Sequence, residues 1–227
     1  MSGNEQLNVI AIDGPAGSGK STVAKRTARR LDWTYVDTGA MYRCLCLKAL
    51  RNDISTDDTD GLVRALDASE IEMSFESGEL TVRLDYEDVS EAIRKTQVDE
   101  AVSDVAAHKE VREKMVDMQR RMGERGEAVV EGRDIGTVVF PDAEHKFFLD
   151  APLDVRARRR YNQLVDSGHT EITYQAVLDD MQQRDETDRE RSAGPLKPPD
   201  DAIMIDTTDP SAEEVVNRII QTLGKDS

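Results

Sequence analysis

The stretch Gly14-Pro15-Ala16-Gly17-Ser18-Gly19-Lys20-Ser21 decides the fold, because it is a complete G-x-x-x-x-G-K-S phosphate-binding loop. The apolar residues 9–12 before it are typical of a buried strand, and residues 22–28 after it favour a helix. In that context the loop's backbone N–H groups and the helix N-terminus surround a polyphosphate. We expect Lys20 to reach the β- and γ-phosphates and the Ser21 hydroxyl to ligate Mg²⁺. The sequence therefore predicts binding of a nucleoside triphosphate.

The net charge of the chain limits the classes of partner that it can bind. Among 227 residues, 30 Lys and Arg stand against 46 Asp and Glu, a net charge of −16. Such an acidic surface repels nucleic acid and anionic membranes, so we expect neither a polymeric nucleic acid nor a membrane as partner. The only cysteines, Cys44 and Cys46, lack further metal-ligand neighbours and are interpreted as free thiols. Free thiols fit a reducing compartment, so we expect a cytoplasmic protein.

The periodicity of the chain predicts an α/β fold. Five segments have the composition of core strands: residues 9–12, 33–36, 128–130, 146–149 and 202–206. Helical segments separate them, which predicts a mostly parallel sheet covered on both faces.

Residues between these strands depart from that pattern. Residues 71–75 and 80–84 alternate around a Ser77-Gly78 turn and, with 87–89, predict a small inserted antiparallel sheet. The acidic residues 52–60 are interpreted as an exposed loop. Further helices are predicted over 153–165 and 174–191, and a capping box of Ser211 and Glu214 predicts a C-terminal helix to about residue 223.

Arginines form local clusters in this acidic chain. They are Arg43, Arg112, Arg133, Arg156, Arg158, Arg159, Arg160, Arg184, Arg189 and Arg191. An enzyme that moves a phosphoryl group between two anionic nucleotides needs such cations in its transition state. The alternative is that these arginines are solvated or paired with acidic residues, and for Arg159 or Arg189 alone it is equally strong. For Arg43 and Arg133, which follow strands at Gly-containing turns, a role at the site is favoured.

Four segments of the chain resemble those of the bacterial cytidylate kinases. They are the phosphate loop, Asp37-Thr38-Gly39-Ala40-Met41-Tyr42-Arg43, Gly132-Arg133-Asp134-Ile135-Gly136-Thr137-Val138-Val139-Phe140-Pro141 and Arg184-Asp185-Glu186-Thr187-Asp188-Arg189. The likeness runs from the first strand to the last helix, and the segment 132–141 is highly specific. The inserted sheet also looks like that of the bacterial type.

The resemblance implies a three-layer P-loop kinase fold with a central five-stranded parallel sheet, the inserted antiparallel sheet and a helical lid. The implied reaction transfers the γ-phosphoryl group of ATP to CMP or dCMP with Mg²⁺, giving CDP or dCDP and ADP in pyrimidine nucleotide metabolism. The expected partners are these small nucleotides, and the expected state is a monomer. The sequence leaves the preference between CMP and dCMP open.

The resemblance also implies roles for individual residues. Residues expected to bind ATP are Gly14, Pro15, Ala16, Gly17, Ser18, Gly19, Lys20, Ser21 and Thr22, with Ser21 as the metal ligand. Those expected around the cytosine are Thr38, Ser103, Arg112 and Asp134. Those expected at the ribose are Tyr42, Arg184 and Asp188, and at the acceptor phosphate Arg43, Arg133 and Arg191. Arg158 and Arg159 fall in the lid over ATP, and the catalytic set is Lys20, Arg43, Arg133, Arg158, Arg159 and Arg191.

The chemistry of cytosine agrees with two of these assignments. The Asp134 carboxylate can accept from N4, and the Arg112 guanidinium can donate to N3 and O2. Uracil reverses the pattern, so UMP should lose roughly one to two orders of magnitude. The alternative for Asp134 is an ion pair with Arg133 or a helix cap. Asp13, Asp37 and Asp150, at strand ends, could hold water ligands of the metal or bond to nearby backbone.

These expectations divide the chain into regions. A single nucleotide kinase domain over 1–227 has its core at about 7–37, 127–153 and 200–225. The monophosphate-binding region with its insertion covers about 38–126. The lid covers about 154–192, with Ser167-Gly168-His169 as its flexible tip.

Two other functions remain at this point. Another small-molecule P-loop kinase, acting on UMP, AMP or shikimate, should lack the segment 132–141. A non-catalytic nucleotide switch is less favoured, because a GTPase would carry an N-K-x-D motif and the sequence contains none.

Overall fold

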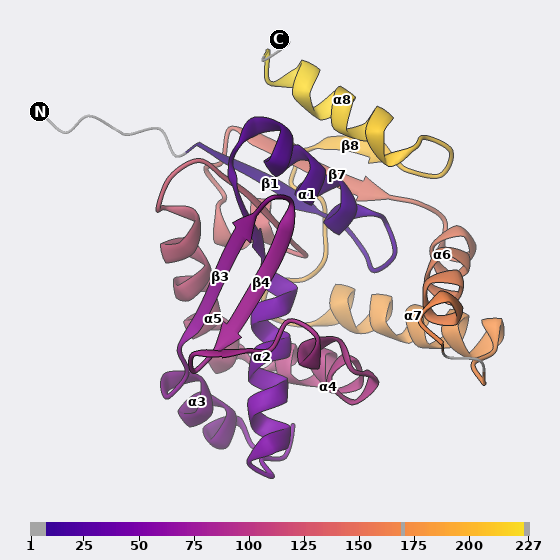
Figure 1. Ribbon diagram of the computed structural model, residues 1–227. Helices are drawn as coiled ribbons and strands as arrows, with labels where there is room; N and C mark the ends of the chain where they lie inside the picture. The colour runs from indigo at the N-terminus through magenta and orange to yellow at the C-terminus, as the bar shows by residue number, and fades with distance from the viewer. Residues whose placement is uncertain (1–7, 169–170, 225–227) are drawn as a thin grey trace, which may run out of the picture.

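A computed structural model describes residues 8–168 and 171–224 of the chain (Figure 1). Its central sheet has five strands, all parallel, in the order β2-β6-β1-β7-β8. Their bounds are β1 (Val9–Asp13), β2 (Thr34–Asp37), β6 (Ala128–Gly132), β7 (His145–Asp150) and β8 (Ile203–Asp206). The five strands predicted from the sequence are confirmed, and because they run in parallel their carboxyl ends share one edge.

Helices cover both faces of this sheet, as the apolar strands require. On one face Ile10 and Ile12 pack with α1 (Lys20–Leu31) and α8 (Ala212–Thr222), which lie side by side in Figure 1. On the other face Val9 and Ala11 pack with α5 (Lys109–Gly123) and a single π-helical turn, η2 (Ile135–Val139). The predicted capping box of α8 is confirmed, since both of its reciprocal bonds form.

The chain between β2 and β6 forms a second body with its own core. Its elements are α2 (Thr38–Arg51), α3 (Thr59–Asp67), β3 (Ile71–Glu76), β4 (Glu79–Leu84), β5 (Glu87–Asp88), η1 (Ala92–Arg94) and α4 (Thr96–Ala107). The strands β3-β4-β5 form the predicted antiparallel sheet, although β5 has only two residues. The predicted loop 52–60 ends earlier than expected, because the Asp58 side chain caps α3 by accepting from the backbone N–H of Gly61.

Two helices lie beyond the carboxyl ends of β7 and β8 (Figure 1). They are α6 (Leu153–Asp166) and α7 (Tyr174–Glu190), close to the predicted bounds. Ala157, Val177 and Met181 form a small core between them, against which Ala16 of the phosphate loop also packs. His169, part of the predicted tip, lies outside the described residues. None of the described helices is long and apolar enough to cross a membrane.

Candidate functional site

The phosphate loop lies between β1 and α1, and its glycines are required by its shape. Gly14 has φ +153°, and a Cβ there would lie 2.1 Å from the backbone oxygen of Leu149. Gly17 has φ +75°, and a Cβ there would lie 3.0 Å from that of Arg156. Both positions therefore favour glycine strongly. Because these glycines have no side chain, the backbone of the loop can lie this close to its neighbours and to a ligand.

The Lys20 ammonium folds back over this loop. Its Nζ donates to the backbone oxygen of Pro15 at 3.1 Å, so it lies where a bound polyphosphate would be surrounded. Burial, and next the Arg133 guanidinium, lower the pKa of Lys20 to about 7. A phosphate anion would favour the charged form and raise that pKa.

A buried carboxylate that the sequence analysis did not single out lies beside the loop. Glu131, 2% exposed, is the penultimate residue of β6, and its Oε2 accepts from the Ser21 hydroxyl at 2.9 Å. Its other oxygen accepts from the Tyr35 hydroxyl. Burial, and next the charge of Asp37, raise the pKa of Glu131. A carboxylate directly after the apolar run 128–130 was the signal that could have found it.

Ser21 and Glu131 fit a magnesium ion. In P-loop enzymes a loop hydroxyl and a carboxylate at a strand end hold Mg²⁺ together with phosphate oxygens. Among the described residues no three His, Cys, Asp or Glu side chains form a metal cluster. A metal here would therefore depend on these two residues, on the nucleotide and on water.

The three aspartates at strand ends form hydrogen bonds to backbone. Asp13 accepts from the N–H groups of Ile135 and Gly136, each at 2.8 Å. Asp37 accepts from the Ala40 N–H and pairs with Arg43, and Asp150 accepts from the Ala151 N–H. The pKa of Asp37 stays below its usual value although burial raises it, because the Arg43 cation and the Ala40 N–H outweigh burial. Of the two roles expected for these aspartates, hydrogen bonding to nearby backbone is therefore observed for all three.

Predicted substrate residues from three separate segments form one buried group, the arginine–aspartate cluster of Arg112, Arg133, Asp134, Asp188 and Arg191. Asp134 pairs with Arg112, and its Oδ1 lies 3.8 Å from Nη2 of Arg191. Asp188 pairs with Arg133 Nε at 2.8 Å and with Arg191 Nη1 at 3.3 Å. Burial alone would raise the pKa of Asp188, but the cations Arg133 and Arg191 hold it below its usual value. The alternative roles considered for Asp134 are wrong, because its side chain caps no helix and its partners are Arg112 and Arg191.

The cluster adjoins the phosphate loop, and donors around it lack partners. Arg133 Nη1 donates to the backbone oxygen of Gly14 at 3.2 Å. Within the described part of the chain, the Tyr42 hydroxyl and the Nε atoms of Arg43 and Arg184 are buried without hydrogen-bond partners. Burial raises the pKa of Tyr42 to about 12, so it remains a donor. Buried donors normally find acceptors, so these are suited to a ligand rich in oxygen.

Other predicted residues lie at the margins of this site. The Thr38 hydroxyl donates to the backbone oxygen of Glu131 at 2.7 Å. Ser103 is half-buried on α4. The Arg158 guanidinium lies 4.1 Å from the centre of the Tyr174 ring, and Arg159 donates to the Thr207 backbone oxygen at 2.5 Å.

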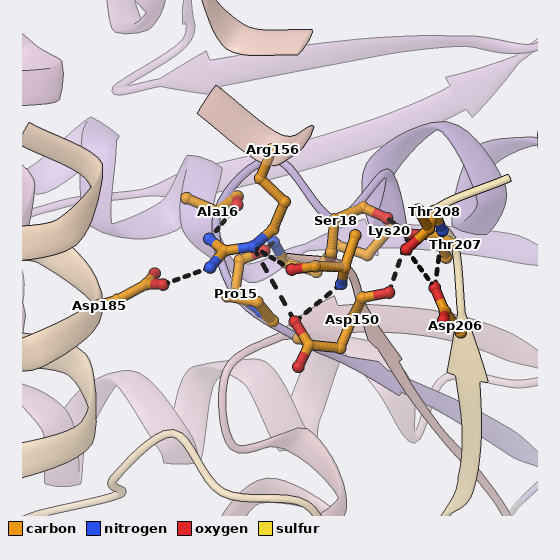
Figure 2. Close-up of polar contacts among 12 residues, drawn as sticks. Pro15, Ala16, Ser18, Lys20, Asp150, Arg156, Asp185, Asp206, Thr207 and Thr208 are labelled. Carbon is orange, nitrogen blue, oxygen red and sulfur yellow. Dashed lines mark hydrogen bonds and ion pairs between the residues drawn. The ribbon is translucent and has the colours of Figure 1, made fainter. Parts of the chain in front are cut away.

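The arginine that contacts the loop from the lid is Arg156 (Figure 2). Its Nη1 donates to the backbone oxygen of Ala16 at 3.0 Å, and its Nη2 to Asp185 Oδ2 at 2.7 Å. In this arrangement Arg158 and Arg159 contact Tyr174 and Thr207, and their expected role in the lid over ATP stays a prediction. Position in the helix explains the difference, since Arg156 belongs to the buried face of α6 and packs beside Ala157.

Comparison with known proteins agrees with this geometry. The cytidylate kinase family matches residues 10–225. The chain belongs to the cytidylate kinase family. A cytidylate kinase from Caldanaerobacter subterraneus subsp. tengcongensis is 50% identical over 218 residues, which cover 96% of this chain and 95% of that protein. One from Bacillus subtilis is 42% identical over 218 residues, 96% of this chain and 97% of that protein.

The fold is also found in solved structures. An uncharacterized protein from Eubacterium ventriosum shares it with a TM-score of 0.50 at 14% identity, covering 97% of this chain and 99% of the other. As a member of the cytidylate kinase family, the chain has at one edge of its sheet a phosphate loop, a carboxylate–hydroxyl pair and a buried cationic cluster. Such a site can align two phosphates and neutralise charge between them.

Proposed function

We infer that this protein is a cytidylate kinase, transferring the γ-phosphoryl group of ATP to CMP or dCMP. The observation that carries this conclusion is the convergence of the phosphate loop with the arginine–aspartate cluster, in a chain that matches the family over nearly its whole length. The products are CDP or dCDP and ADP. Kinases for UMP, AMP or shikimate, and a non-catalytic switch, receive no support from these relatives.

We propose that ATP occupies the loop of residues 14–22. Lys20 lies against its β- and γ-phosphates, and Ser21 and Glu131 hold the metal. Bound Mg²⁺ would neutralise charge on the transferring phosphate. Arg156 supports this arrangement by fixing the backbone of Ala16 from the lid side. Burial of Lys20 favours its attraction to the phosphates, because opposite charges attract more strongly where water is excluded.

The acceptor nucleotide binds at the arginine–aspartate cluster in this proposal. Arg43, Arg133 and Arg191 grip its phosphate, whose oxygen attacks the γ-phosphorus. That oxygen is already anionic, so no strong base is needed and catalysis consists of positioning and charge stabilisation. Tyr42, Arg184 and Asp188 face the ribose. Donors of Tyr42 and Arg184 that lack partners among the described residues support these contacts.

Base selection follows from a buried pair. Asp134 accepts from N4 of cytosine, and Arg112 donates to N3 and O2. The two side chains already contact each other, so the carboxylate is oriented before the base arrives. With uracil, Asp134 would face the 4-carbonyl acceptor, which leaves two acceptors opposed. Thr38 and Ser103 complete the proposed base site.

The proposal also covers the regions of the chain, its oligomeric state and its location in the cell. Residues of about 154–192 form a lid, and about 38–126 the monophosphate-binding region of a single domain. The protein acts as a cytoplasmic monomer. Its reducing surroundings are supported by the two buried, unpaired cysteines Cys44 and Cys46.

One steady-state assay tests the function. ADP production from ATP and Mg²⁺ is measured with CMP, dCMP, UMP or AMP, for the wild type and for Lys20→Ala. We expect turnover with CMP and dCMP, turnover with UMP reduced by at least roughly tenfold, and none in the well-folded variant. Equal rates with all four acceptors, or full activity of Lys20→Ala, would contradict the proposal.

A further inference from the structure

The turn that carries the base-reading carboxylate is capped in an unusual way. Asp134 is the N-cap residue of the π-helical turn η2, and aspartate in that position commonly accepts from the first N–H groups of its own helix. Here the Asp134 side chain accepts from none of them. It contacts Arg112 and Arg191 in the arginine–aspartate cluster instead. Some other group must therefore accept from the buried N–H groups at the start of the turn.

That group comes from a different strand. Asp13, the last residue of β1, is 1% exposed, and each of its two carboxylate oxygens accepts one N–H of η2. Oδ1 accepts from Ile135 and Oδ2 from Gly136, both at 2.8 Å. Such a bidentate bond fixes both the place and the tilt of the turn. The turn and the phosphate loop are also tied by the contact between Arg133 and Gly14.

We propose that Asp13 is a positioning residue for recognition of the pyrimidine base. By capping η2 in place of Asp134, it leaves the Asp134 carboxylate to pair with Arg112 and Arg191 and, with them, to face the base. Because Gly14 follows Asp13 directly, the same residue sets the base-reading turn relative to the phosphate loop. Asp13 itself touches no substrate in this arrangement. The inference rests on the proposed function, since it assumes that Asp134 reads the acceptor base.

A variant of the same shape tests this role. Asp13→Asn retains one acceptor oxygen and presents an NH₂ group to the second N–H of the turn, which tilts η2 without opening a cavity. We expect KM for CMP to rise about tenfold and the preference for CMP over UMP to fall about tenfold, as for one lost hydrogen bond to a charged group. KM for ATP should change less than about twofold, because the phosphate loop keeps its own bonds.

Two further variants separate positioning from general stability. Asp58→Asn alters another carboxylate cap, that of α3 in the second body, and should leave both KM values and the preference for CMP unchanged. Asp13→Glu keeps the charge but is one methylene longer, so it displaces the turn and should show the same selective loss for CMP. It also provides the test if Asp13→Asn fails to fold.

The outcomes distinguish this inference from the function on which it rests. A wild type that does not prefer CMP over UMP would overturn the proposed function itself. A wild type that prefers CMP, with Asp13→Asn and Asp13→Glu variants that lose activity equally for ATP and CMP or keep the wild-type preference, would overturn only the positioning role. A selective rise in KM for CMP with a lost preference supports it.

Discussion

At the scale of single residues, the arginines of the arginine–aspartate cluster are paired with the aspartates of the same cluster. Arg133 and Arg191 share Asp188, and Arg112 pairs with Asp134. Buried ion pairs contribute little net stability, but removing one partner leaves an uncompensated charge. The cluster is therefore better explained as preorganisation for an anionic substrate than as a device for stability.

Asp188 offers a residue-scale test of ribose recognition. We expect Asp188→Ala to reduce kcat/KM for CMP more than for dCMP, because only CMP has a 2′-hydroxyl that can donate to this carboxylate. The additional loss should be about 1–2 kcal/mol, roughly five- to thirtyfold. Steady-state kinetics with the two acceptors measures it.

The ion pairs of Asp188 indicate which result would contradict this prediction. Since its carboxylate also holds Arg133 and Arg191, some loss is expected with both acceptors. Equal losses for CMP and dCMP would assign Asp188 to ordering these arginines and would remove it from the ribose site. Asp188→Asn, which retains an acceptor oxygen, should lie between the wild type and the alanine variant.

A second residue-scale prediction concerns pH. Burial raises the pKa of Asp13 from 3.8 to about 7, although the Gly136 and Ile135 N–H groups oppose that rise. A carboxyl whose pKa is higher in the folded state favours folding below its unfolded pKa, and this contribution is lost as pH rises through the folded value. The stability of the wild type should therefore fall between about pH 4 and pH 7 relative to Asp13→Asn, by up to about 4 kcal/mol.

The comparison of two proteins isolates that titration. Urea unfolding of the wild type and of Asp13→Asn at several pH values gives the difference in free energy of unfolding. Groups that do not interact with Asp13 titrate alike in both proteins, so they cancel, and the remaining difference reports Asp13 together with Asp134 and Lys20, whose charges act on it. A difference that stays constant from pH 4 to pH 8 would show that Asp13 is not buried as a raised-pKa acid.

From the sequence alone, the position of a site residue can be predicted where a motif is local. Lys20 and Ser21 occupy the phosphate loop as the spacing predicted. Glu131 was missed because its partner Ser21 lies 110 residues away, and only the pairing of β6 with β1 brings them together. The role of Asp13 was likewise hidden, since its bonds reach Ile135 and Gly136, more than 120 residues along the chain.

At the scale of elements, pattern predicted the strands and most helices. The apolar runs predicted the five parallel strands, and the alternation of apolar and polar residues predicted the β3-β4 hairpin. Helix α3 was not predicted, because its few apolar residues follow an acidic segment typical of a loop. The turn η2 could not be predicted, because its bonds over five residues depend on backbone geometry and on the cap that Asp13 supplies.

At the scale of the whole molecule, polar contacts such as Arg156–Ala16, Arg159–Thr207 and Asp188–Arg133 hold the two lid helices to the rest of the protein. Their shared core has only three buried residues, with Ala16 and six other partly buried hydrophobic residues packed around them. Arg160 of α6 also pairs with Asp99 of α4 at 2.8 Å. That pair is partly exposed, so it contributes about 1 kcal/mol or less. Segments with little buried apolar surface open at low free energy. We therefore expect the lid to open and admit nucleotides without disturbing the sheet.

Lid closure on nucleotides is the whole-molecule prediction. Arg156 of α6 and Arg191, directly after α7, are proposed to surround the phosphates, and Arg184 of α7 the ribose, so we expect ligands to enter only when these helices move apart. Closure would exclude water and limit wasteful hydrolysis of ATP. Hydrogen exchange in α6 and α7 should slow by roughly tenfold when a bisubstrate analogue binds. The strand β1, already in the middle of the sheet, should change little and serves as the internal control. Equal exchange in α6 and α7 with and without the analogue would mean that the two helices form a rigid wall, and the nucleotides would then have to enter along the side facing α4.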